Sequence, residues 1–215
     1  MKFLTLLKGQ LKDILGAGMV SIIMLLTPGY FLINVNARYD SATLSYHLSP
    51  LATVGPLLIF GSILTGITIG SPFWLLGFRK NWHFLLHRSV KRITVLVSLI
   101  TAAILVLAVF TGGCWTLLFL YASVPGHFIL PPTTQVYFEG WLFISLGLVF
   151  YFGTALSGIS TARLYTTRLF GILFAGITFI VIFMSLNIIW AYTVVALSIM
   201  ILASQVFYVF LNRDF

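Results

Sequence analysis

Charged residues are scarce in this chain. Only 7% of its 215 residues are Asp, Glu, Lys or Arg, and 60% are hydrophobic, whereas soluble domains carry roughly 25% charged residues. This composition excludes a water-soluble single domain. It also excludes a disordered chain, because so much apolar surface does not stay solvated.

Cysteine and acidic residues are scarcer still. The single cysteine, Cys114, has no partner for a disulfide within the chain and cannot supply a cysteine-based metal site. Four acidic residues against 12 basic ones leave a net charge of +8. We expect no nucleic-acid partner, because a basic nucleic-acid-binding face needs a soluble scaffold to present it. We therefore use the positions of the basic residues to predict how the chain is oriented in a membrane.

The sequence motifs of common enzymes are absent as well. The chain has neither a G-x-x-x-x-G-K-[ST] loop to bind the phosphates of ATP nor an H-E-x-x-H pair to hold a catalytic zinc ion. His83 and His87 could share one face of a helix, but no acidic third ligand lies near them in the sequence. We therefore predict no catalytic residues and no metal site in this chain.

Long apolar segments dominate the sequence. Six of them are long enough to cross a membrane, at about 20 residues per crossing. We expect all six to be helical, because a backbone in lipid must satisfy its own hydrogen bonds. The predicted fold is an all-α polytopic membrane protein, with residues 1–215 as a single transmembrane domain of six transmembrane helices. The predicted spans cover residues 14–35, 51–78, 93–121, 138–160, 169–186 and 189–211.

The first residues form a separate amphipathic segment. Apolar residues recur at helical spacing on one face of this segment, and lysines lie on another face. This pattern predicts an N-terminal interfacial helix that lies among lipid headgroups. A cytoplasmic lead into the first span, without an interfacial role, is the alternative. The apolar residues are Phe3, Leu7, Leu11 and Ile14, and the lysines are Lys8 and Lys12.

Positive charges fall on one side of the predicted spans. Eleven of the 12 Lys and Arg residues lie at the two termini or in the links between spans two and three and spans four and five. Arg38 alone lies on the other side. By the positive-inside rule, both termini and these links are predicted to be cytoplasmic, in a multi-pass protein of the cell membrane.

The link between spans two and three combines basic and aromatic residues. A loop that only sets the topology needs a few basic residues and little else. Interleaved aromatic and basic residues favour a short helix that contacts lipid on one side and a protein partner on the other. An interfacial anchor without a partner is the alternative. The candidate partner-binding residues are Phe78, Arg79, Lys80, Trp82, Phe84, Leu85 and Arg88.

Two glycines in the second span are candidates for helix packing. Gly66 and Gly70 form a G-x-x-x-G spacing, which lets another helix approach closely. The spacing fits a specific dimer contact, but chance can also supply it among the 18 glycines of this apolar sequence.

Glu139 is the only carboxylate near the centre or mouth of a predicted span. An acid buried in a membrane is by default a functional hypothesis. The polar, proline-rich loop before Glu139 favours a solvated carboxylate instead.

Together these segments resemble the membrane subunits of type-2 ABC exporters, small bacterial permeases that carry six spans and no ATPase domain. The resemblance covers most of the chain, in the family's order. It lies in the amphipathic lead 1–15, the Leu76-Gly77-Phe78-Arg79-Lys80 turn with its basic aromatic helix, Tyr137-Phe138 at the start of span four, Phe152-Gly153 with Gly158, the basic turn 163–171, and the final Phe210-Leu211-Asn212-Arg213.

The resemblance implies a division of the chain into an elbow helix (1–13), spans one and two (14–78), a cytoplasmic coupling loop (79–92) and spans three to six (93–211). The coupling loop would dock on a separate ABC ATPase subunit, which binds the ATP and Mg²⁺. The permease would work as a dimer, with a second copy of this chain or a related permease, in a bacterial cell membrane. The family's re-entrant helices between spans five and six have no room here.

The spans are nearly free of ionisable residues and rich in aromatic and small ones. A path lined in this way suits a hydrophobic or amphipathic cargo, such as a peptide or lipid. The function expected from the resemblance is therefore export of such a cargo. The alternative is a non-transporting membrane protein, such as an immunity or regulatory factor, whose basic loop only sets the topology.

Overall fold

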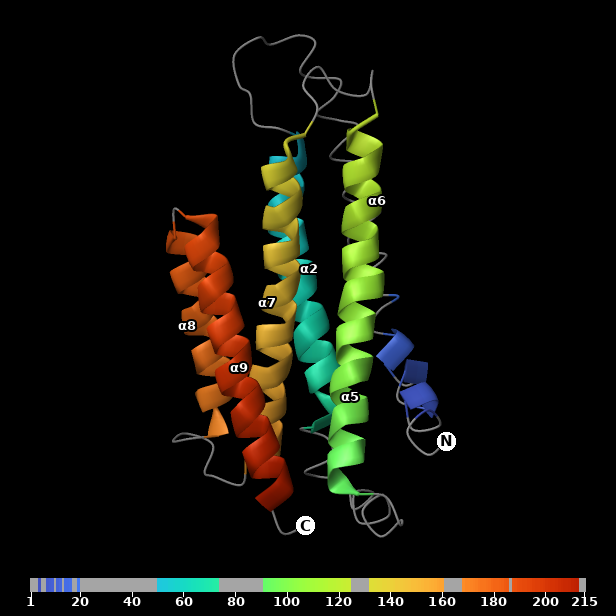
Figure 1. Cartoon of the computed structure of the whole chain (residues 1–215), viewed down its shortest axis with the longest axis vertical. Coiled ribbons are helices and arrows are strands. Elements are labelled where there is room, and N and C mark those ends of the chain that lie inside the picture. Colours follow the sequence, from blue (N-terminus) through green and yellow to red (C-terminus); the bar gives the residue numbers. More distant parts are fainter. Residues whose placement is uncertain are drawn as a thin grey trace.

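The computed structural model describes residues 4, 7–9, 11, 12, 14–16, 19, 50–73, 91–124, 132–160, 168–185 and 187–212. Every regular element in these ranges is a helix, as the composition predicts (Figure 1). The elements are α2 (Pro50–Gly70), α5 (Arg92–Val106), the π-helix η1 (Leu107–Gly112), α6 (Gly113–Ala122), α7 (Thr134–Ile159), α8 (Phe170–Met184) and α9 (Ile188–Asn212).

Three helices are long and apolar enough to cross a membrane. They are Arg92–Ala122, in which α5, η1 and α6 follow without a break, Thr134–Ile159 and Ile188–Asn212. They lie where the sequence predicts the third, fourth and sixth spans. Several such helices in one chain indicate a multi-pass membrane protein.

Two shorter apolar helices accompany them, over Val54–Gly70 and Phe170–Met184. They fall within the second and fifth predicted spans. The first predicted span, residues 14–35, lies almost wholly outside the described residues. The count of six spans therefore stays a prediction.

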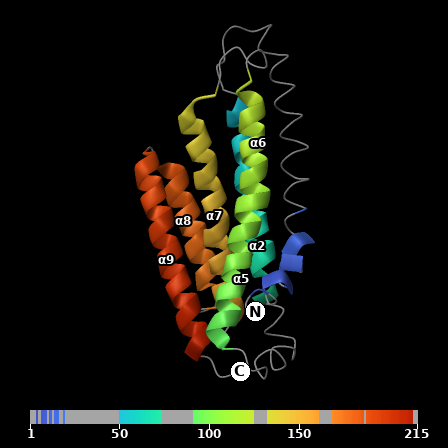
Figure 2. The ribbon, with the colours of Figure 1, turned by 45° about the vertical axis from the view of Figure 1, so that its right-hand side comes forward.

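Helix α7 lies at the centre of the bundle. It packs against α2, η1, α8 and α9, with α8 and α9 on one side and α2 and the α5–α6 rod on the other (Figures 1 and 2). Of the most apolar stretch of α7, 83% is buried within the chain, against 28% for α9. The exposed side chains of α9 are mostly large and apolar, which suits contact with lipid.

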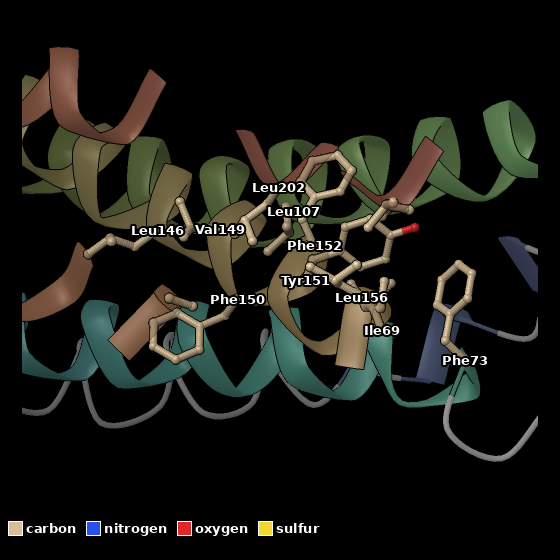
Figure 3. Packing of buried hydrophobic residues seen from close by; sticks show 14 of the residues in the cluster. Ile69, Phe73, Leu107, Leu146, Val149, Phe150, Tyr151, Phe152, Leu156 and Leu202 are labelled. Atoms are coloured by element: carbon tan, nitrogen blue, oxygen red, sulfur yellow. The ribbon is translucent and has the colours of Figure 1, made fainter. Parts of the chain in front are cut away.

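The core divides into two clusters. The larger cluster joins α7 to the other helices over most of the bundle, and part of it is shown in Figure 3, including Ile69 and Phe73, Leu107, and Leu202. The smaller cluster lies where α2 and α7 begin. It consists of Val54, Leu58, Cys114, Trp115, Leu118, Ala122 and Ile144.

The N-terminal segment packs with its apolar face on the bundle. Ile14 is buried in the larger cluster, and Leu7 and Leu11 pack against it. Lys8 and Lys12 are exposed. This is the division of faces that the spacing of these residues predicts; contact of the segment with lipid headgroups stays a prediction.

Candidate functional site

The partner-binding residues predicted in the link between spans two and three, Phe78 to Arg88, lie outside the described residues. The link's last two basic residues are described. Lys91 is exposed and has an extended backbone, and its carbonyl oxygen accepts the hydrogen bond of Thr94 N at 2.9 Å. Arg92 then begins α5. The structure therefore places the end of the link directly before the longest helix of the described ranges.

The described basic residues lie toward one end of the bundle, at the starts of α5 and α8 or in the N-terminal segment (Figure 1). This end, called here the basic end, is where α5 and α8 begin and where α7 and α9 end (Figure 1). Arg168 donates a hydrogen bond from Nε to the carbonyl oxygen of Ser157 at 3.4 Å, which connects it to the last turns of α7. The basic residues described there are Lys8, Lys12, Lys91, Arg92 and Arg168.

The two candidate packing glycines of α2 face α7. A methyl group at Gly66 would overlap the carbonyl oxygen of Gly147. At Gly70 it would lie 2.8 Å from Cβ of Thr154 and 3.0 Å from the carbonyl oxygen of Tyr151. Because these contacts are with backbone or with the root of a side chain, the two helices pack too closely for any larger residue. The face that carries both glycines is thus occupied by a helix of the same chain.

Helix α7 contributes packing glycines of its own, which the sequence did not predict as packing positions. Gly147 packs against the backbone of α2 at Ser62. Gly153 packs in a similar way against the backbone of Gly171 in α8. Gly140 lies under the ring of Trp115. The available signal was spacing: Gly140 and Gly147 are two helical turns apart and share one face of α7.

The ring of Trp115 is held firmly over α7. Its indole Nε1 donates a hydrogen bond to the carbonyl oxygen of Tyr137 at 3.1 Å. A methyl group at Gly140 would overlap the ring. Trp115 is only 2% exposed and belongs to the smaller core cluster. A glycine in α7 is therefore what lets an aromatic ring of α6 lie flat against this part of the helix.

A cavity of about 270 Å³ lies beside this ring, at the end of the bundle opposite the basic end. Its walls come from α2, α6 and α7, with one side chain from the end of α8. They include Pro56, Trp115, Glu139, Gly140, Phe143 and Phe183. The end of the bundle that contains this cavity is called the Glu139 end.

Glu139 is the only acidic residue in the described part of the chain. Its side chain is partly buried and lines the cavity. Its Oε1 accepts a hydrogen bond from Nε2 of Gln135, one turn earlier, at 2.9 Å. Gln135 itself lines a second hollow of about 560 Å³ between the start of α7 and the start of α9. There the hydroxyl group of Tyr192 donates a hydrogen bond to the carbonyl oxygen of Phe138 at 2.6 Å.

No family model, curated protein or solved structure matches this chain.

Proposed function

We propose that this chain is the permease subunit of an ATP-driven exporter of the type-2 ABC class. A separate ATPase subunit would bind ATP and Mg²⁺ and hydrolyse the ATP. The chain would pair with a second copy of itself or with a related permease and move a hydrophobic or amphipathic substrate, such as a peptide or lipid.

The observation that supports this proposal most is the position of the described residues on either side of the link over residues 74–90. Helix α2 ends near the basic end, where Phe73 is buried in the larger cluster, and α5 begins there at Arg92. The residues that flank the link thus both lie toward the basic end, on the side that the positive-inside rule assigns to the cytoplasm. A cytoplasmic ATPase would find the aromatic and basic residues of the link on this side.

A second observation concerns the N-terminal segment. Its apolar residues Leu7, Leu11 and Ile14 pack on the bundle while its lysines are exposed. An amphipathic helix lying along the cytoplasmic surface of the membrane, next to the first spans, fits the elbow helix of such permeases.

The proposal is tested at Trp82. A buried aromatic anchor contributes far more to an interface than a charge at its rim. We expect Trp82→Ala to weaken association with the ATPase by on the order of 2 kcal/mol, about 30-fold in affinity. The measurement is co-purification of the permease with an ATPase subunit that lacks membrane spans and is encoded beside it, together with phosphate release by the complex.

Two controls make the result specific. Lys91→Ala removes an exposed charge at the end of the same link and should cost little, because Arg92 supplies a second charge there. Reporter fusions at Phe215 check that each variant inserts with a cytoplasmic C-terminus. Undiminished ATPase recovery and stimulation with Trp82→Ala would contradict a coupling role and favour a non-transporting protein whose loop only sets the topology.

A further inference from the structure

The carboxylate of Glu139 is placed unusually for a protein in which charge is so scarce. It lines a cavity with apolar and aromatic walls at the Glu139 end. The basic residues in the described ranges lie at the starts of α5 and α8 or in the N-terminal segment, toward the basic end (Figure 1). The hydrogen bond from Gln135 uses one of the roughly four positions at which a carboxylate accepts hydrogen bonds. A partly buried carboxylate in apolar surroundings is costly unless a cation or further donors meet it.

Among the side chains that line the cavity, Glu139 is the acceptor, and the one indole donor, Nε1 of Trp115, is already bonded to the carbonyl oxygen of Tyr137. Gln135 is exposed and lines the neighbouring hollow. Its amide nitrogen donates a hydrogen bond to Glu139, so its carbonyl oxygen, on the same amide group, is a second acceptor beside the carboxylate. A group that brings positive charge and several N–H donors fits these acceptors. A primary ammonium group carries three such donors.

The walls of the cavity indicate what kind of molecule would carry the ammonium group. Trp115, Phe143 and Phe183 provide aromatic surface, which attracts both a cation and an apolar chain. Phe183 is also 75% exposed, on the apolar outer surface of α8, so the cavity is bordered by the surface that suits contact with lipid. A volume of about 270 Å³ holds roughly nine water-sized groups. That is enough for a small headgroup and the first carbons of a chain.

We propose that this cavity binds the primary ammonium group of an amphiphile, with the ammonium on Glu139 and Gln135 and the apolar part against Phe143 and Phe183. The hollow beyond Gln135, with Asn187 and Tyr192 in its lining, takes the remaining polar part of a larger headgroup. This inference goes beyond the exporter proposal and rests on the cavity alone. Its test therefore needs no ATPase.

The experiment uses the purified full chain in phosphatidylcholine nanodiscs and dodecylamine that carries a photoreactive diazirine. We expect dodecylamine to label peptides that contain Glu139 or Phe143, and dodecanol of the same design to label them at least about tenfold less, because it lacks the charge. Competition with phosphatidylethanolamine or with unlabelled dodecylamine then distinguishes a lipid headgroup from a free amine as the better occupant.

The decisive variant is Glu139→Gln, which keeps the shape of the side chain and removes its charge. We expect it to lower dodecylamine labelling by about tenfold or more and to leave dodecanol labelling unchanged. Glu139→Asp should retain part of the labelling. Lys91→Gln also removes one charge, but at the basic end, and should have no effect. Equal labelling of wild type and Glu139→Gln by dodecylamine, with both proteins folded, would overturn the proposal.

Discussion

The two halves of α7 use glycine for different purposes. From Val149 to Ile159 every residue is buried, and backbone contacts close the space on both sides, through Gly147 to α2 and through Gly153 to α8. Between Thr134 and Phe143 only Gly140 and Leu142 are buried. There the space above Gly140 holds the ring of Trp115, and a cavity remains beside it.

This difference separates a part of the bundle that holds the helices together from a part that has room for a ligand. Where two helices pack backbone to backbone, no side chain between them can change its rotamer to make room. A larger residue there must displace a whole helix. A helix packed against a ring can adjust by rotating that ring. We therefore expect substitutions in the two halves to differ both in size and in kind.

The largest effect is expected at Gly66. Its β-methyl group would overlap the backbone of Gly147, so Gly66→Ala should separate α2 from α7 and lower the free energy of unfolding by about 3 kcal/mol. The measurement is thermal unfolding in detergent. It is followed by a maleimide dye that reacts with Cys114, the only cysteine in the chain, which is 4% exposed.

Gly176→Ala is the matched control. This glycine lies within α8, and nothing lies within 4 Å of its added methyl group. Alanine there should leave stability unchanged or raise it by about 0.5 kcal/mol, because glycine is the weaker helix former. If the two variants unfolded alike, close packing of α2 on α7 would not be what stabilises this half of the bundle.

A smaller and more local effect is expected at Gly140. Alanine there must displace the Trp115 ring and break its hydrogen bond to Tyr137, at a cost of about 1 to 2 kcal/mol. Because Cys114 is next to Trp115 in the smaller cluster, we expect the dye to label Gly140→Ala faster even well below its unfolding temperature. Gly66→Ala should not show this low-temperature labelling until it unfolds. The opposite order of effects would mean that the two halves of α7 do not differ as described.

Much of the fold was predictable from the sequence, because membrane helices are long apolar runs. The helix Arg92–Ala122 extends the predicted third span by one residue at each end. Its π-helical segment was not predicted, since nothing in the local composition of Leu107–Gly112 differs from that of its neighbours. Gly66 was predicted as a packing position, but its partner, Gly147, belongs to a helix far along the chain.

The cavity was harder to predict than the helices. The sequence identifies Glu139 as an isolated acid, and its proline-rich neighbourhood favours a solvated side chain. The other walls of the cavity include Pro56, Trp115 and Phe183. These residues belong to three different helices, whose packing the sequence alone does not predict. The residues next to Glu139 in the sequence therefore predict only the part of the cavity that α7 contributes. The predicted coupling residues from Phe78 to Arg88 stay predictions, because they lie outside the described residues.

The smallest effect concerns two tyrosines, Tyr151 in the densely packed half of α7 and Tyr192 of α9 beside the start of α7. The hydroxyl group of Tyr151 is buried among apolar side chains, with the Phe73 ring 6.2 Å from its own, and has no hydrogen-bond partner in the described part of the chain (Figure 3). Tyr192 donates its hydroxyl to the carbonyl oxygen of Phe138. A buried hydroxyl without a partner costs free energy, whereas a paired one contributes about 1 kcal/mol.

Replacing each tyrosine with phenylalanine should therefore act in opposite directions. Tyr151→Phe should keep or raise the free energy of unfolding, by up to about 1 kcal/mol, because it removes a polar group that gains nothing in the densely packed half. Tyr192→Phe should lower it by about 1 kcal/mol and loosen the start of α7 against α9. The same Cys114 labelling assay compares both. A loss of stability in Tyr151→Phe as large as that in Tyr192→Phe would show that its hydroxyl is paired, and that the packed half of α7 contains a polar contact after all.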